Sequence, residues 1–203
     1  MIREGLTVDN FDSALRSLLE FDAAPGASSP SALEAFLSQH GYSKIFLPVG
    51  LAKLREELSP DHEPALAVPH AFEMLHAVKN RHNLAIVTMG SPSLQYSKLK
   101  KAGIDPAFFS KIVIIEEKNK KPSYQAIIEE ARLPSQEVVV CGDRVAVDLV
   151  PAKELCCHTV HMARGRGRAL RESALSSGIA DYAIEDWQDF PTLIERINTL
   201  GHS

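Results

Sequence analysis

The stretch Val138-Val139-Val140-Cys141-Gly142-Asp143 decides the fold, because it is a short apolar run that ends in a glycine and an acid. Its length and its β-branched residues predict a strand buried on both faces of a parallel sheet. Asp148 lies five residues beyond Asp143, in the helical pattern that comes next. Two carboxylates placed in this way can converge on one cation, and hard oxygen ligands suit Mg²⁺. The stretch therefore predicts Asp143 and Asp148 as metal ligands, with helix capping as the alternative role.

The same alternation continues on both sides of this strand. Further short apolar runs predict strands at 84–88, 112–115, 158–162 and 181–184, and helical patterns lie between them. Strands that alternate with helices form a parallel sheet, because the crossover connections are right-handed and cover both faces. We therefore expect an α/β fold with a Rossmann-like parallel sheet, in which ligands bind beyond the carboxyl ends of the strands.

Two further segments carry candidate phosphate ligands. Thr88-Met89-Gly90 ends one predicted strand just before a helix, where a hydroxyl and successive backbone N–H groups favour an anion. Lys121 stands before another helix, next to Pro122, and a lysine can balance the charge of phosphate and carboxylate groups. Taken singly, each segment fits an ordinary helix start or a solvated lysine equally well.

The length and composition of the chain limit the classes of protein to which it can belong. The chain has 203 residues, 45% of them hydrophobic and 24% charged, and a formal net charge of −4. This length predicts one domain, or one with a modest insertion, and the negative charge argues against a general nucleic-acid binder. No apolar run approaches the ~18 residues of a membrane span, and the first residues show no signal-peptide stretch, so we expect no membrane association. Three cysteines give no disulfide framework, and a reducing, cytoplasmic setting is expected.

Residues 16–82 differ from the rest of the chain. They are helical in pattern, with breaks at Pro25-Gly26, Pro30, Pro48 and Pro60, and they contain no convincing strand. This region predicts a small helical insertion between two strands of the sheet.

The candidate residues, taken in their order along the chain, indicate a protein family more specifically than any one of them does. Thr88 after a strand, Lys121-Pro122 before a helix, and Gly142-Asp143 with Asp148 resemble the second, third and fourth motifs of the haloacid dehalogenase superfamily. The resemblance implies a parallel sheet of strand order 5-4-1-2-3. It also implies a core domain formed by residues 1–17 and 67–203, a helical cap at 18–66 inserted after the first strand, and a Mg²⁺-dependent phosphatase-type site for a small phosphorylated molecule.

The first motif of that family, Asp-x-Asp-x-Thr at the end of the first strand, has no intact counterpart here. The nearest text is Asp9-Asn10-Phe11-Asp12-Ser13-Ala14. If Asp12 matches the second family aspartate, the general acid/base, then Asn10 stands where the nucleophile belongs, and a neutral amide cannot serve as that carboxylate. Alternatively, Asp9 is the nucleophile and Asp12 the acid, or the true motif lies upstream of this chain. A fourth interpretation is that the segment only begins a helix, with Asp9 or Asp12 as its cap.

Two smaller signals favour structural roles. Cys156-Cys157-His158 with His161 has no second cysteine pair to support zinc, so a buried strand is the favoured interpretation. The arginine-rich loop 164–168 could contact a phosphate-bearing ligand or a protein partner, but a solvated loop is favoured.

These observations leave two classes of function open. One is a phosphohydrolase of small phosphorylated metabolites whose activity is weakened by the degenerate first motif. The other is a catalytically inactive relative that keeps the fold and serves as a ligand- or protein-binding module.

Overall fold

The computed structural model describes residues 6–23, 29–57, 67–117 and 119–200. By contacts the chain divides into two compact units, Met1–His62 and Glu63–Ser203. The first unit holds three helices in its described part, α1 (Phe11–Ala23), α2 (Ser29–Gln39) and α3 (Phe46–Glu57). Leu6 and three side chains of α2 form its buried centre (Leu33, Phe36, Leu37), on which apolar residues of α1 and α3 pack. Residues 6–23 and 29–57 contain no strand.

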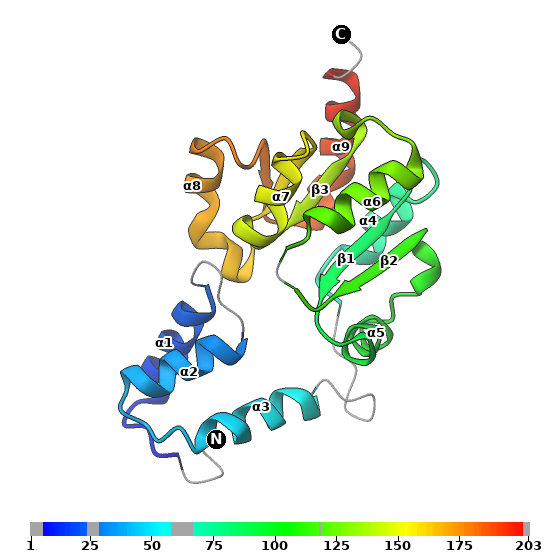
Figure 1. The fold of residues 1–203 in the computed structure, drawn as a ribbon. Helices are drawn as coiled ribbons and strands as arrows, with labels where there is room; N and C mark the ends of the chain where they lie inside the picture. The colour runs from blue at the N-terminus through cyan, green and yellow to red at the C-terminus, as the bar shows by residue number, and fades with distance from the viewer. Residues whose placement is uncertain (1–5, 24–28, 58–66, 118, 201–203) are drawn as a thin grey trace. The chain divides into compact units, whose positions relative to one another are not determined.

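The second unit alternates strands with helices, as Figure 1 shows. Its strands are β1 (Ala85–Met89), β2 (Lys111–Ile115), β3 (Val139–Gly142), β4 (His158–Met162) and β5 (Tyr182–Ile184). Its helices are α4 (Ala71–Val78), α5 (Pro92–Lys101), α6 (Lys121–Ala131), α7 (Val150–Lys153), α8 (Arg171–Ser176) and α9 (Phe190–Leu200). The predicted α/β class is therefore confirmed. No helix in the part of the chain that the structure describes is long and apolar enough to cross a membrane.

The strands of this unit form two parallel sheets rather than one. One sheet pairs β1 with β2, and the other has the order β3-β4-β5. In the strand order that the resemblance implies, the first strand would lie between β1 and β3. Among the described residues no strand takes that place, so β1 and β3 each have a single neighbour.

The open edge of β1 is covered by side chains. In a strand, successive residues direct their backbone groups to opposite edges. The Gly90 N–H donates to the Ile115 carbonyl and continues the pairing with β2, so Val87 and Met89 face the other edge. There the Val87 carbonyl accepts a hydrogen bond from Lys120 and the Met89 carbonyl accepts one from Gln95. These two side chains satisfy carbonyls that a neighbouring strand would otherwise pair.

The hydrophobic core of the three-stranded sheet lies between the sheet and α9. Val160, Met162 and Ile184 are buried against Ile194 and Ile197 of that helix. A second cluster in α4 (Met74, Leu75, Val78) packs on Trp187 and Phe190, which also contact the first. Continuous burial of this kind fixes the strands, and the strands in turn fix the loops at their carboxyl ends.

The resemblance implied that residues 1–17 belong to the core domain and that the cap begins at residue 18. By contacts, the described residues 6–17 group with the three helices of the first unit, and the domain boundaries remain a prediction. Helix α1 begins at Phe11, and Asn10 stands at its start. The Asn10 side-chain oxygen accepts a hydrogen bond from the Ser13 N–H at 2.9 Å, which is typical of a helix N-cap.

Asp181 links β4 to the start of β5 and makes stability depend on pH. Its carboxylate accepts a hydrogen bond from the Thr159 N–H at 2.9 Å and pairs with Lys153. Burial alone would raise the pKa of Asp181, but these hydrogen bonds outweigh it and lower the pKa below its usual value. A lowered pKa stabilises the fold above the unfolded value of about 3.9, and that stability is lost as the pH falls through the folded pKa.

We therefore expect the free energy of unfolding of the Asp181→Asn variant to fall less than that of the wild type between about pH 5 and about pH 3. Urea denaturation at several pH values measures this difference. Glu172→Gln is the control, because the Glu172 side chain is 85% exposed. Equal pH slopes for Asp181→Asn and the wild type would show that Asp181 does not contribute.

Candidate functional site

The carboxyl ends of β1 and β3 carry the candidate residues. Thr88 and Met89 end β1, and Gly90, with φ of 137°, turns the chain toward α5. Asp143 directly follows β3, and a single wide helical turn, Val145–Leu149, carries Asp148 back toward that strand. A side chain on Gly142 would lie 2.4 Å from Cβ of Asp148, so only glycine permits this close approach.

Asp148 forms a buried ion pair with Lys120. The Lys120 Nζ lies 2.7 Å from Oδ1 of Asp148, and the two side chains are only 12% and 8% exposed. The same ammonium donates to the Val87 carbonyl at 2.7 Å, and the Arg144 N–H donates to the other Asp148 oxygen at 3.0 Å. Lys120 thus contacts both β1, through the Val87 carbonyl, and the turn after β3, through Asp148. The phosphate and metal residues were expected at this edge of the sheets.

Lys121, which we predicted as the phosphate-binding lysine, points elsewhere. Its Nζ pairs with Glu154 at 2.8 Å, and its side chain is 39% exposed. Helix α6 begins at Lys121, and Lys120 is the residue just before it. Consecutive residues at a helix start point in different directions, so a difference of one position moves the ammonium away from the cluster. In the structure Lys120 is therefore the lysine that contacts Asp148, and phosphate binding by Lys121 remains a prediction.

The buried groups around Asp148 experience its negative charge. Burial raises the pKa of the Cys141 thiol, and the charges of Asp148 and Asp143 raise it further. Burial and the Asp148 charge likewise raise the pKa of the Tyr124 hydroxyl. Cys141 therefore remains a protonated thiol at neutral pH and is a poor nucleophile.

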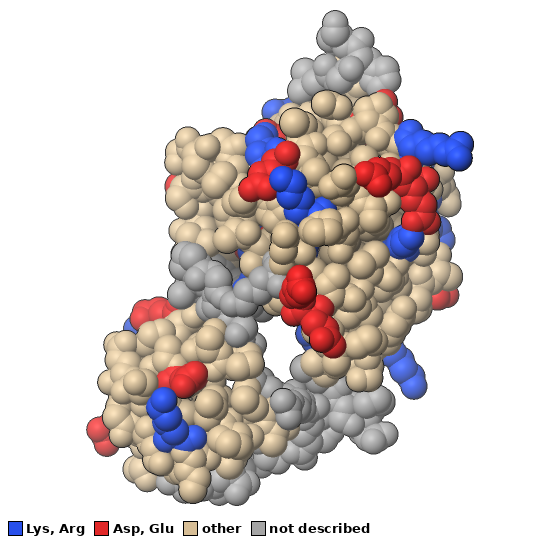
Figure 2. Space-filling model, viewed as in Figure 1, with Lys and Arg blue, Asp and Glu red and all other residues tan. Residues whose placement is uncertain are grey.

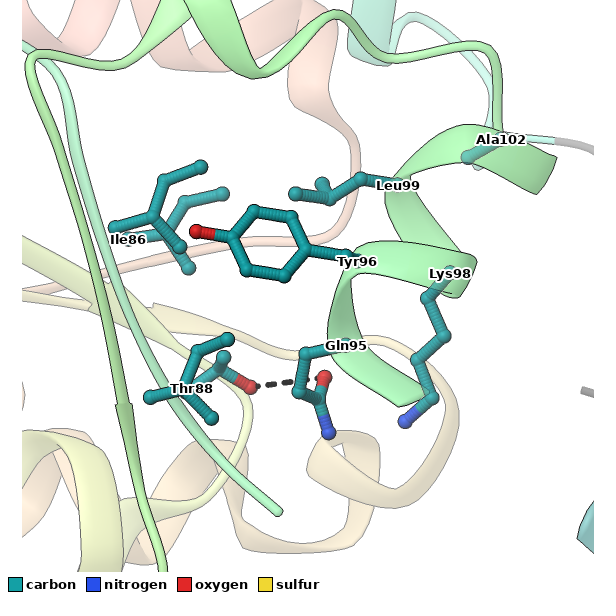
Figure 3. Close-up of a pocket in the computed structure, with 9 residues that line it drawn as sticks. Ile86, Thr88, Gln95, Tyr96, Lys98, Leu99 and Ala102 are labelled. Atoms are coloured by element: carbon teal, nitrogen blue, oxygen red, sulfur yellow. Dashed lines mark hydrogen bonds between the residues drawn. The ribbon is translucent and has the colours of Figure 1, made fainter. Parts of the chain in front are cut away.

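A pocket of about 260 Å³ lies between α5 and the face of the β1-β2 sheet (Figure 3). Isoleucine, leucine and alanine side chains form most of its wall, and Tyr96 and Lys98 of α5 complete it together with two polar residues, Thr88 and Gln95. The Thr88 hydroxyl donates to the Gln95 side-chain oxygen at 3.2 Å, the bond drawn in Figure 3. The pocket therefore has an apolar wall and a polar end beside the end of β1.

Gln95 was not among the residues predicted from the sequence. Its amide nitrogen donates to the Met89 carbonyl at 2.9 Å, while its oxygen accepts from Thr88. The Gly90 N–H, which we expected to face an anion, donates instead to the Ile115 carbonyl at 2.9 Å. A buried glutamine in the first turn of a helix, just after a candidate turn, was the signal that could have identified Gln95.

Asp9, Asn10 and Asp12 belong to the first unit, whereas the candidate residues described above belong to the second. We expected them to end a strand, but Asn10 instead caps α1 and Asp12 lies in its first turn. This geometry matches the interpretation in which the segment only begins a helix, with Asn10 rather than Asp9 or Asp12 as the cap. The role of these three residues in catalysis remains a prediction.

The structure also shows what surrounds the cysteine–histidine segment 156–161 and the arginine-rich loop 164–168. Cys157 and His161 are buried in the second unit, at 2% and 0% exposure, and burial lowers the pKa of His161. In the described ranges no group of three or more His, Cys, Asp or Glu residues could hold a metal ion. Arg168 and Arg171 form ion pairs with Glu185, so acidic neighbours balance part of the basic loop.

The donor set at β3 fits Mg²⁺. This ion binds through one or two carboxylates, several waters and the substrate's phosphate oxygens, so Asp143 and Asp148 suffice without a third protein acid. The two oxygens of Asp148 already accept hydrogen bonds, from Lys120 and from the Arg144 N–H. Asp143 and Asp148 are the residues that would hold Mg²⁺ here, and the ion would supply charge neutralisation for a phosphoryl group.

Comparisons with known proteins identify the family of this chain. A family model described as haloacid dehalogenase-like hydrolase matches residues 8–155. The chain belongs to the haloacid dehalogenase-like hydrolases. The matched range holds the ends of β1 and β3, Lys120 and both aspartates, and hence the whole cluster described above in the second unit.

Named relatives in this family are phosphatases. Glyceraldehyde 3-phosphate phosphatase of Pyrococcus abyssi is 28% identical over 207 residues, which is 98% of this chain and 83% of that protein. The enzyme of the same name from Methanocaldococcus jannaschii is 29% identical over 134 residues, which is 64% of this chain and 57% of that protein. The chain therefore matches little more than half the length of this second relative.

Solved structures show the same fold at low sequence identity. The HAD-hydrolase YfnB of Bacillus subtilis, bound to magnesium, has a TM-score of 0.64 and 18% identity, with 96% of this chain and 86% of that chain covered. A HAD phosphatase of Thermococcus onnurineus has a TM-score of 0.55 and 20% identity, with coverage of 89% and 87%. At these identities the likeness supports the fold.

Proposed function

We propose that this chain carries a phosphohydrolase-type site for a small phosphorylated metabolite at the carboxyl ends of β1 and β3. The observation that carries the proposal is the buried Lys120 ammonium, which contacts both Val87 in the middle of β1 and Asp148 after β3. Thr88 and the Met89 N–H would contact the phosphoryl oxygens together with Lys120. Asp143, supported by Asp148, would hold Mg²⁺, which supplies charge neutralisation for the phosphoryl group when it is bound.

The substrate class follows from charge and size. Lys120 is the ammonium in this cluster, so a single phosphoryl group matches it better than a long polyanion does. On the face seen in Figure 2, acidic and basic side chains of the coloured residues are interspersed, and no broad basic surface for nucleic acid appears. The named relatives act on glyceraldehyde 3-phosphate, and we propose a phosphorylated metabolite of that size.

The activity of this chain alone is proposed to be weak. Phosphoryl transfer in the family uses a carboxylate nucleophile and a second carboxylate as acid and base. In the described residues Asn10, which the motif comparison places at the nucleophile's position, is an amide that caps a helix, and no strand fills the position between β1 and β3. Loss of a nucleophile that acts as part of a unit can cost roughly 10⁶ in kcat.

A second function is favoured by the same observation. A site that retains Thr88, Lys120 and Asp143 but lacks the nucleophile can still bind a phosphorylated molecule. The chain would then serve as a catalytically inactive ligand- or protein-binding module.

Turnover of an aryl phosphate and of glyceraldehyde 3-phosphate, with and without Mg²⁺, tests the proposal. We expect slow turnover that chelation with EDTA abolishes. Asp143→Asn should lower the rate at least tenfold, because it removes a charged metal ligand, while Asp105→Asn, which changes a helix cap away from the site, should leave it unchanged. Turnover insensitive to both EDTA and Asp143→Asn would contradict the proposed site. Tight phosphate binding without turnover would favour the binding module.

A further inference from the structure

Gln95 holds the whole candidate phosphate-binding turn through one side chain. It is 9% exposed, and its carboxamide reaches three consecutive residues, Thr88, Met89 and Gly90. The amide nitrogen donates to the Met89 carbonyl, and the amide oxygen accepts from the Thr88 hydroxyl. A Cβ on Gly90 would lie 2.7 Å from the same nitrogen, so the glycine leaves room for the amide.

The orientation of this amide is determined by its two partners. The Met89 carbonyl can only accept a hydrogen bond, so the nitrogen must face it and the oxygen must face Thr88. A reversed amide would oppose two acceptor oxygens. The Thr88 hydroxyl has a single proton, and Gln95 therefore fixes where that proton points in the protein without a bound phosphate.

The orientation of the Met89 carbonyl affects how well this turn can bind an anion. It faces the open edge of β1, the edge where Lys120 meets the Val87 carbonyl. A carbonyl oxygen that turned toward a bound phosphate would repel it, whereas the N–H of the same residue would attract it. The Met89 carbonyl shares its peptide with the Gly90 N–H, which donates to the Ile115 carbonyl. By holding this carbonyl, Gln95 fixes the Met89–Gly90 peptide and keeps its oxygen from turning toward a bound anion.

We propose that Gln95 is a positioning residue of the phosphate site, which fixes the Met89 peptide and the Thr88 hydroxyl for the anion. This inference rests on the proposed function, since it assigns Gln95 a task in that site. Gln95 itself need not touch the phosphate. Its effect should pass through Thr88 and Met89.

The first test needs no phosphate. In Gln95→Met, which keeps the length of the side chain but removes both hydrogen bonds, the Gly90 amide should exchange with solvent about tenfold faster than in the wild type, because each lost bond weakens the turn. Gln125→Met is the matched control, because Gln125 is exposed and its amide bonds to the exposed Glu129 on α6. Unchanged exchange at Gly90 would overturn the inference, whether or not the chain binds phosphate.

The second test measures the affinity of inorganic phosphate by calorimetry in the presence of Mg²⁺. We expect Gln95→Met to weaken binding about tenfold and Thr88→Val to have less effect in that background than in the wild type, since the two act together. Gln95→Glu should approach the wild-type affinity as the pH falls, because a protonated carboxyl can both donate and accept. Additive effects of Gln95→Met and Thr88→Val, or no recovery in Gln95→Glu, would overturn the inference. Absence of phosphate binding in the wild type would instead count against the proposed function.

Discussion

Lys120→Met is expected to lower the free energy of unfolding by about 3–5 kcal/mol, the usual cost of removing one partner of a buried ion pair. The substitution keeps the apolar stem but leaves Asp148, whose side chain is 8% exposed, without its ammonium. It also removes the donor to the Val87 carbonyl. Urea denaturation followed by circular dichroism measures the loss.

The neighbouring lysine provides the control. Lys121→Met should change the free energy of unfolding by less than about 1 kcal/mol, because its pair with Glu154 is largely exposed. Adding Asp148→Asn to Lys120→Met should restore part of the lost stability, since an amide is cheaper to bury than an unpaired charge. A larger loss in Lys121→Met than in Lys120→Met would show that the two lysines have been assigned the wrong way round.

The largest effect on activity is expected from a strand that carries the missing carboxylates. We predict that an apolar strand ending in Asp-x-Asp, joined to Met1 by a flexible glycine–serine linker, raises aryl phosphate turnover by several orders of magnitude, up to about 10⁶. The physical reason is that, among the described residues, β1 and β3 each pair with a single strand, so each has an edge at which an added parallel strand can pair.

Two controls separate this effect from others. The same fusion with Asn-x-Asn should pair without raising turnover, because an amide cannot attack phosphorus. Asn10→Asp combined with Ala14→Thr should give no gain, because Asn10 caps α1 and an aspartate there serves as an equally good cap. Strong turnover from that double variant would restore Asn10 as the position of the nucleophile and contradict this account.

The strands of the second unit could be predicted from the sequence for a physical reason. Runs such as Val139–Cys141 and Ile112–Ile115 are half-buried strands of the parallel sheets, and their apolar, β-branched composition reflects that environment. The turn residues Gly142, Asp143 and Asp148 follow from the same run, because the glycine permits contact between the strand and the following turn. Those parts of the site depend on local sequence alone.

Other features of the site depend on the exact residue at which a helix starts and on contacts between segments that are distant in the sequence. Lys120 and Lys121 are identical in chemistry, and only the exact start of α6 decides which one faces Asp148. Gln95 acquires its role from Thr88 and Met89, seven and six residues earlier on another element. Asn10 caps α1 in the structure, and its place in a degenerate catalytic motif remains a prediction, because an asparagine suits both positions.

The central claim is that phosphate binds at the carboxyl ends of β1 and β3. Titrating inorganic phosphate in the presence of Mg²⁺, while following backbone amide chemical shifts, tests it directly. We predict saturable shifts at Met89 and at Asp143 that disappear in Lys120→Met and persist in Lys121→Met. Shifts confined to the basic loop 164–168, or no saturable shift at all, would contradict it.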